Sequence, residues 1–154
     1  MDVNSSFEEV LNRDGRLAYT NVGFSMSPLI REGRDVMLIE KRDITQIKRY
    51  DAVLFRRENI KGRGEYVLHR ILKILPDGSF YIVGDSCING EIVKPSQILG
   101  VLIGINRSGK SVNMNGIGYK MYVALWCAPY GLRVGVLKAK RFLRRVIRRL
   151  KIRR

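Results

Sequence analysis

The chain has 154 residues, of which 45% are apolar, so one domain with a buried core and an appendage can form without disulfide staples. There are 29 basic and 14 acidic residues, a net charge of +15, and ten of the basic residues lie in residues 138–154. The two cysteines, Cys87 and Cys127, form no CxxC pair, and with the single histidine they give no zinc-site spacing. We therefore expect free thiols in a reducing compartment, no metal and no cofactor.

The first predicted element is a short amphipathic helix over residues 6–12, capped by Ser5 or Ser6. No apolar run in the first 21 residues is long enough for a signal peptide or a membrane span. Residues 16–22 predict a strand that leads into the segment Gly23-Phe24-Ser25-Met26-Ser27-Pro28. Because glycine and proline bound this segment, we expect a turn that presents Ser25.

Further strands are predicted where β-branched and aromatic residues are enclosed by Gly, Asp and Pro, over residues 35–40, 52–56, 65–75, 79–83 and 98–106. Pro76-Asp77-Gly78 predicts a hairpin turn between the strand that carries His69 and the strand that ends at Asp85. This hairpin would place His69 and Asp85 on adjacent strands. Many short strands with one small helix predict a mostly β fold, either a coiled β barrel or a sandwich.

A turn serine, a single histidine and an aspartate at a strand end are the residue types of acyl transfer. A serine hydroxyl is a weak nucleophile until a base removes its proton, and the base works better when an acid fixes its orientation. In the strand, alternation puts Val67, His69 and Ile71 on one face. Such aliphatic surroundings favour the neutral imidazole that a general base requires.

Other interpretations of these residues stay open. Serine is common in turns, so Ser25 alone does not indicate a nucleophile. The thiol of Cys87 is an alternative nucleophile, although it lacks the glycine and proline that present Ser25. Asp51 is the first rival of Asp85 for the orienting acid, followed by Asp35 and Asp77.

Three sequence blocks, in this order, resemble the type I signal peptidase superfamily: Gly-x-Ser-Met-x-Pro from Gly23, Val-Leu-His-Arg-Ile around His69, and Gly-Ser-Phe-Tyr-Ile-Val-Gly-Asp ending at Asp85. The resemblance covers residues 22–102 and is closest to the endoplasmic-reticulum and archaeal branch, in which histidine replaces the catalytic lysine. It implies a mostly β peptidase with Ser25 as nucleophile, His69 as general base and Asp85 as orienting acid. Gly23 stands where some bacterial members have an oxyanion-hole serine. Backbone amides, first that of Ser25, are therefore the expected donors, with Gly23 and Met26 in the same substrate-binding turn.

The composition changes after residue 116. Residues 121–128 form an apolar patch, which Pro129-Tyr130-Gly131 interrupts. The following apolar residues recur at helical spacing opposite a face of Lys and Arg: Val136, Ala139, Leu143, Val146, Ile147 and Leu150. We expect a basic amphipathic helix in the headgroup region of an anionic membrane, peripheral or shallowly inserted, rather than a membrane span. The predicted division is thus a catalytic β domain over residues 1–116 and a membrane-associating region over residues 117–154.

Two alternatives to membrane binding remain for the tail. The helix can dock on its own protein, or it can bind nucleic acid, although the chain lacks the interleaved aromatic and basic pattern and the helix-turn-helix that would support the latter. Overall, the sequence predicts a serine endopeptidase that cleaves a leader or precursor peptide, or a preprotein, at the cytoplasmic side of a membrane. The rival predictions are a non-catalytic or self-cleaving regulator of the same fold, and a basic adaptor protein.

Overall fold

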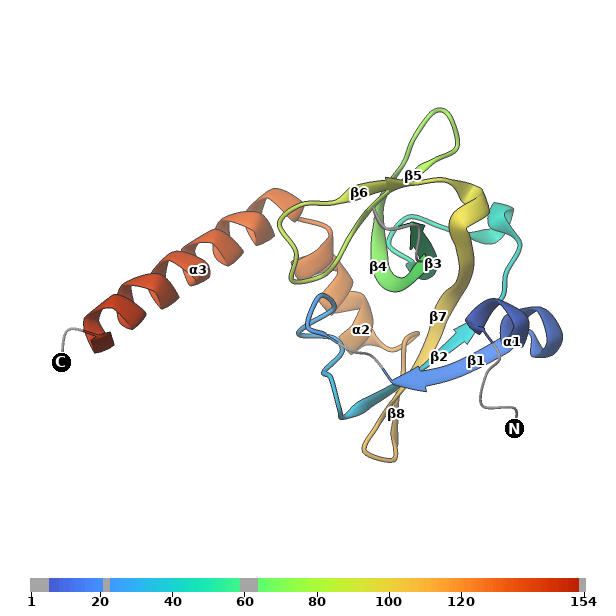
Figure 1. Cartoon of the computed structure of the whole chain (residues 1–154), viewed down its shortest axis with the longest axis horizontal. Coiled ribbons are helices and arrows are strands. Elements are labelled where there is room, and N and C mark those ends of the chain that lie inside the picture. Colours follow the sequence, from blue (N-terminus) through green and yellow to red (C-terminus); the bar gives the residue numbers. More distant parts are fainter. Residues whose placement is uncertain (1–5, 21–22, 59–63, 153–154) are drawn as a thin grey trace.

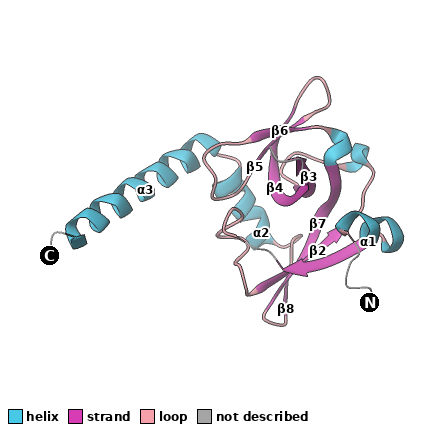
Figure 2. Cartoon of the chain, viewed as in Figure 1, coloured by secondary structure: helices cyan, strands magenta, loops and turns pink. Residues whose placement is uncertain are grey.

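A single antiparallel sheet forms the body of the protein. The computed structural model describes residues 6–20, 23–58 and 64–152, and within these ranges there are eight strands in the order β1-β2-β7-β3-β4-β5-β6, with β8 paired to β7. The strands are β1 (Arg16–Thr20), β2 (Asp35–Glu40), β3 (Ala52–Glu58), β4 (Gly64–Ile74), β5 (Phe80–Val83), β6 (Glu91–Val93), β7 (Ile98–Arg107) and β8 (Lys110–Val112). The ribbon coils rather than lying flat (Figures 1 and 2), and the predicted mostly β fold is confirmed.

The β4–β5 hairpin positions most of the candidate site. Its turn is the predicted Pro76-Asp77-Gly78 segment, in which the Asp77 carboxylate accepts hydrogen bonds from the backbone N–H and the hydroxyl of Ser79. In the hairpin register, Arg70 lies opposite Val83. On its other side β4 pairs with β3, where His69 lies opposite Val53. The sheet encloses two apolar clusters, and His69 lies beside the one that contains Val53.

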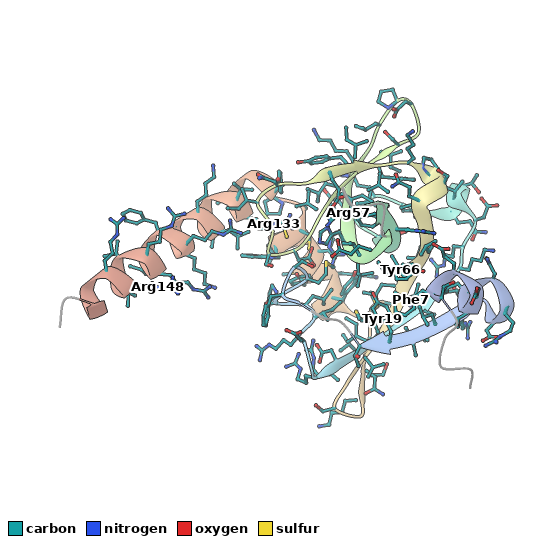
Figure 3. All side chains as sticks on the ribbon, viewed as in Figure 1. Phe7, Tyr19, Arg57, Tyr66, Arg133 and Arg148 are labelled. Atoms are coloured by element: carbon teal, nitrogen blue, oxygen red, sulfur yellow. The ribbon has the colours of Figure 1, made fainter. Side chains whose placement is uncertain are left out.

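At the N-terminus, helix α1 (Phe7–Asp14) closes one end of the sheet. Ser6 caps it through a capping box with Glu9, and the helix ends at Gly15, which has a φ of 70°. Phe7 contacts the rings of Tyr19 and Tyr66 (Figure 3), so the helix is anchored by aromatic packing. The predicted cap Ser6 is confirmed, whereas the alternative Ser5 and the end of the predicted strand over residues 16–22 lie outside the described residues.

Short 3-10 turns occur at Ile44–Gln46 and Pro95–Gln97, and the remaining helices are C-terminal. Helix α2 (Ile117–Tyr122) runs into a π-helical turn, η3 (Val123–Cys127), and then into α3 (Tyr130–Ile152). Tyr119 and Tyr122 pack against the larger apolar cluster. The packing of the β domain therefore continues past the division predicted at residue 116.

Helix α3 is the basic amphipathic helix predicted from residue 136, and it begins earlier, at Tyr130. It projects away from the sheet as an arm (Figure 1). Among the described residues, none of the helices combines the length and the apolar character needed to cross a bilayer.

Candidate active site

The turn that carries Ser25 is held at both ends. Met26 and Ile30 are fully buried in the larger apolar cluster, and the Ile30 N–H donates to the Met26 carbonyl. Gly23 has a φ of 105°, a conformation that residues with a side chain rarely adopt. Ser25 itself is half-buried and Phe24 beside it is exposed. Met26 therefore anchors the turn in the core. Its side chain is fully buried, which corrects the expectation from the sequence that Met26 belongs to the substrate-binding surface.

His69 lies in the middle of β4 with only 8% of its surface exposed. Its ring lies 6.1 Å from the ring of Phe55, and Val67 and Ile71 belong to the same apolar surroundings, as alternation predicted. Burial lowers the pKa of His69 below its ordinary value, and the nearby negative charge of Glu91 opposes this effect. The imidazole is thus held in the neutral form that can accept a proton.

The backbone of Ser25 and the imidazole of His69 both lie beside Gly84, the residue that follows β5. A Cβ built on Gly84 would stand 2.7 Å from the Ser25 carbonyl oxygen, 2.9 Å from His69 Nε2 and 2.8 Å from Cys87 Sγ. No side chain fits there, so the glycine allows the Ser25 turn and the imidazole to approach each other. The Ser86 N–H and hydroxyl also donate to the Ser25 carbonyl, at 2.8 and 3.1 Å.

A cavity of about 430 Å³ opens at this junction. Its wall includes Ser25, His69 and Cys87, together with three charged residues, Arg57, Glu65 and Glu91. Among the described residues, no group of three or more histidine, cysteine or acidic side chains could hold a metal ion. What the cavity offers is a hydroxyl, a neutral imidazole and a carboxylate, which is the set of groups that acyl transfer requires.

Asp85 does not face this cavity. Arg70 Nε and Nη2 donate to its two carboxylate oxygens at 2.8 and 2.7 Å, and neither side chain is exposed to solvent. The Tyr122 hydroxyl donates to the same carboxylate at 2.8 Å, and Trp126 Nε1 donates to the Asp85 carbonyl at 3.0 Å. Burial lowers the pKa of Arg70, but the Asp85 charge outweighs it and holds that pKa well above its usual range. Arg70 therefore belongs to the interior of the protein and not to the cavity wall.

Strand parity explains why Asp85 turns away. Because Arg70 lies opposite Val83 and side chains alternate, residues 83 and 85 point to the Arg70 side of the hairpin, whereas Gly84 points to the His69 side. His69 Nδ1 is buried without a hydrogen-bond partner among the described residues. This geometry speaks against Asp85 as the acid that orients His69, and we correct that prediction.

A carboxylate that does lie beside His69 is that of Glu91, at the start of β6. Its Oε1 is 3.6 Å from His69 Nδ1. The three other aspartates considered from the sequence make different contacts. Asp35 pairs with Arg34 and Arg107. Asp51 accepts a hydrogen bond from the Lys48 N–H, and Asp77 caps the hairpin turn.

Sequence reasoning did not find Glu91, Ser86 or Arg57. Glu91 follows a glycine and opens a three-residue strand, which is too short to show an alternating pattern. Within the Gly84-Asp85-Ser86 segment, only Asp85 was given a role from the sequence.

In comparisons with known proteins, no family model, curated protein or solved structure matches the chain.

Proposed function

We propose that the protein is a serine endopeptidase in which Ser25 is the nucleophile, His69 the general base and Glu91 the acid that orients the base. One observation carries the proposal: Ser25 and His69, 44 residues apart in the sequence, line one cavity and approach each other around a glycine that admits no side chain. The resemblance of three sequence blocks to signal peptidases supports the same assignment, and so does the mostly β fold.

The chemistry follows from the two ring nitrogens of His69. Nε2 points to the Ser25 side and takes the hydroxyl proton, while Nδ1, facing Glu91, keeps its own proton. The Ser25 oxygen then attacks the peptide carbonyl carbon, and backbone N–H groups, first that of Ser25, stabilise the oxyanion. The imidazolium returns its proton to the leaving amine, and water repeats the sequence on the acyl-enzyme.

An extended peptide is the substrate that suits this architecture. An extended segment can add to a sheet edge and place alternate side chains in surface pockets. A leader or precursor peptide fits this description as well as a secretory preprotein does.

Labelling with a fluorophosphonate probe tests the proposal directly. The wild-type protein should be labelled at Ser25, and Ser25→Ala should lose labelling and lose peptide cleavage by about 10⁴-fold or more. Ser111→Ala is the control, because it removes an exposed serine hydroxyl on β8 away from the cavity and should still be labelled. An unlabelled, inactive wild-type protein would favour an adaptor or a non-catalytic regulator instead.

The pH dependence gives a second test of the base. Because burial lowers the pKa of His69, kcat/KM should rise with pH through a midpoint below the ordinary histidine value of 6.5 and then level off. Activity that does not change between pH 5 and 9 would contradict the role of His69.

We also propose that α3 holds the protein on an anionic membrane surface at the cytoplasmic face. Four apolar side chains with large exposed fractions lie along one stripe of the helix: Leu132, Val136, Leu143 and Ile147. The opposite face carries cations that include Arg141, Arg145 and Arg148 (Figure 3 labels Arg148, far along the arm). An apolar stripe opposite a cationic face is typical of helices that lie in the headgroup region.

Vesicle sedimentation tests the membrane proposal. Substituting Leu143→Asp together with Ile147→Asp should lower binding to anionic vesicles by roughly 10-fold or more per residue, since each buried side chain contributes about 1.5–3 kcal/mol. Ile44→Asp with Ile74→Asp removes two exposed apolar side chains elsewhere and should leave binding unchanged. Equal losses in both variants, or equal binding of wild type to neutral vesicles, would overturn the proposal.

A further inference from the structure

One carboxylate, that of Glu91, serves two neighbours on the cavity wall. The guanidinium of Arg57 holds it with two hydrogen bonds, from Nε to Oε2 at 2.7 Å and from Nη2 to Oε1. The same Oε1 lies 3.6 Å from His69 Nδ1. Arg57, on β3, and Glu91, on β6, thus form a pair beside the base, and neither is adjacent to it in sequence.

The geometry of this pair fixes the carboxylate. Two parallel hydrogen bonds from a guanidinium define both the position and the plane of a carboxylate, which one ammonium group cannot do. Arg57 is itself held, since its guanidinium lies 5.9 Å from the Phe55 ring and 3.5 Å from a Glu65 oxygen. His69 Nδ1, buried without a hydrogen-bond partner among the described residues, faces the carboxylate so arranged.

We propose that Arg57 is a positioning residue of this site: its guanidinium holds the Glu91 carboxylate beside His69 Nδ1 and offsets the negative charge of that carboxylate. An orienting acid must be close to the base, but an uncompensated charge at that place would keep the imidazole protonated. A paired carboxylate can accept a hydrogen bond from the Nδ1–H group without this effect. The catalytic consequence rests on the proposed function, whereas the electrostatic arrangement does not.

The charged groups around His69 come from four elements. Glu91 on β6, Asp85 after β5 and Glu65 on β4 each raise the pKa of His69, while Arg57 on β3 lowers it. Cys87 also lines the cavity, with a thiol pKa that burial raises. Removing the Arg57 charge should therefore shift the titration of His69 upward, and removing the Glu91 charge should shift it downward.

The chain offers a clean measurement, because His69 is its only histidine. NMR titration of the imidazole in the intact protein reports its midpoint without reference to activity, and nitrogen chemical shifts report which ring nitrogen carries the proton. The variants are Arg57→Gln, Glu91→Gln and Arg57→Lys, with Arg56→Gln as the matched control. Arg56 directly precedes Arg57 on β3 and pairs with Glu8 away from the cavity.

The expected results are an upward shift in Arg57→Gln, a downward shift in Glu91→Gln and no shift in Arg56→Gln. Arg57→Lys keeps the positive charge but cannot form the two parallel hydrogen bonds of a guanidinium. The titration midpoint of His69 should therefore stay near that of wild type, while the fraction of neutral imidazole protonated at Nδ1 falls. If Arg57→Gln does not fold, Arg57→Met removes the same charge and keeps a stem that can pack on Phe55.

An unchanged or lowered midpoint in the uncharged Arg57 variants would overturn the inference, and so would an equal shift in Arg56→Gln. Failure of the proposed function looks different. In that case the fluorophosphonate probe would not label Ser25, while the opposite shifts in Arg57→Gln and Glu91→Gln would still be observed. With an active enzyme, Arg57→Gln should lose more kcat/KM at pH 6 than at pH 8, a pattern that a purely structural role would not produce.

Discussion

The two faces of the β4–β5 hairpin each hold an arginine paired with a carboxylate, in very different surroundings. The Arg70–Asp85 pair has no exposed side-chain surface and is enclosed by Tyr122 and other C-terminal residues. The Arg57–Glu91 pair has 35% and 29% of its side chains exposed and borders the cavity. Removing one partner from a buried pair leaves an uncompensated charge, which is costly, whereas an exposed pair contributes little to stability. The first pair should therefore matter for the fold and the second for the chemistry.

The largest effect should come from shortening the chain, because the buried face depends on the C-terminal helices. Ending the chain after residue 116 removes the Tyr119 hydroxyl that bonds to Arg70, the Tyr122 hydroxyl that bonds to Asp85, and Arg133, whose Nη1 lies 3.6 Å from an Asp85 oxygen. The Arg70–Asp85 pair then loses the residues that cover it. We expect unfolding, or a loss of more than about 4 kcal/mol of unfolding free energy. A chain ending after residue 137 keeps these residues and should retain its fold. Equal stability of the two shortened chains, measured by urea unfolding, would show that the network is dispensable.

Asp85→Asn should have the next largest effect. It leaves the buried guanidinium of Arg70 unpaired, with Arg133 only 3.6 Å from the same carboxylate, so we expect a loss of about 3–5 kcal/mol in unfolding free energy. Asp14→Asn, which breaks an exposed pair with Arg13, is the control and should leave the unfolding free energy nearly unchanged. A stable Asp85→Asn variant that has lost catalysis would restore Asp85 as the orienting acid.

Glu91→Gln should show the reverse pattern. We expect kcat/KM to fall on the order of 100-fold, because the base loses the acid that fixes its orientation, with less than about 1 kcal/mol lost in unfolding free energy. Glu65→Gln is the comparison, since Glu65 lines the same cavity and is more exposed, and its effect on kcat/KM should be much smaller. Equal losses would mean that the charge of the cavity matters rather than the contact with His69.

Most of the fold was predictable because its signals are local. The strands at residues 35–40 and 98–106, the hairpin turn at Asp77-Gly78 and the cap at Ser6 were all indicated by turn residues and alternation. The three-residue strands β6 and β8 were missed because such short segments show no period. Helix α2 was missed because Tyr119 and Tyr122 are placed by contact with the larger apolar cluster.

The residues of the candidate site also divide into those with a local sequence signal and those placed by tertiary contacts. Ser25 and His69, the two residues that the proposal makes nucleophile and base, were named from the sequence because a bounded turn and a unique histidine are visible in one sequence. The sequence could also have predicted on which side of the hairpin Asp85 lies, because the hairpin register determines which residues share a side with Arg70. Glu91 could not be found locally, since its contact with His69 requires β6 to pair with β5 and thereby extend the sheet past β4. The buried role of Tyr122 likewise depends on contacts across 37 residues.

The smallest expected effect concerns the reactivity of the two cysteines. One cysteine lies on each face of the β4–β5 hairpin, so their reaction rates report on the two faces separately. Cys87 lines the cavity and is half-buried, whereas Cys127 is fully buried, with its sulfur 3.7 Å from an Asp85 oxygen. Burial raises the pKa of both thiols, that of Cys127 to about 12, so both should react more slowly than a free thiol. A disulfide reagent at pH 8 should modify one thiol in the native protein and two after denaturation.

Modification of Cys87 should also block catalysis, because a group attached to its sulfur would fill the space beside His69 and Gly84. Cys87→Ser should keep near-wild-type activity and resist the reagent, since the chemistry is assigned to Ser25. Cys127→Ser, on the other face, should remain as sensitive as wild type. An inactive Cys87→Ser variant would instead make the thiol the nucleophile, and equal reaction rates of the two cysteines in the native protein would show that the Asp85 face is less closed than its contacts indicate.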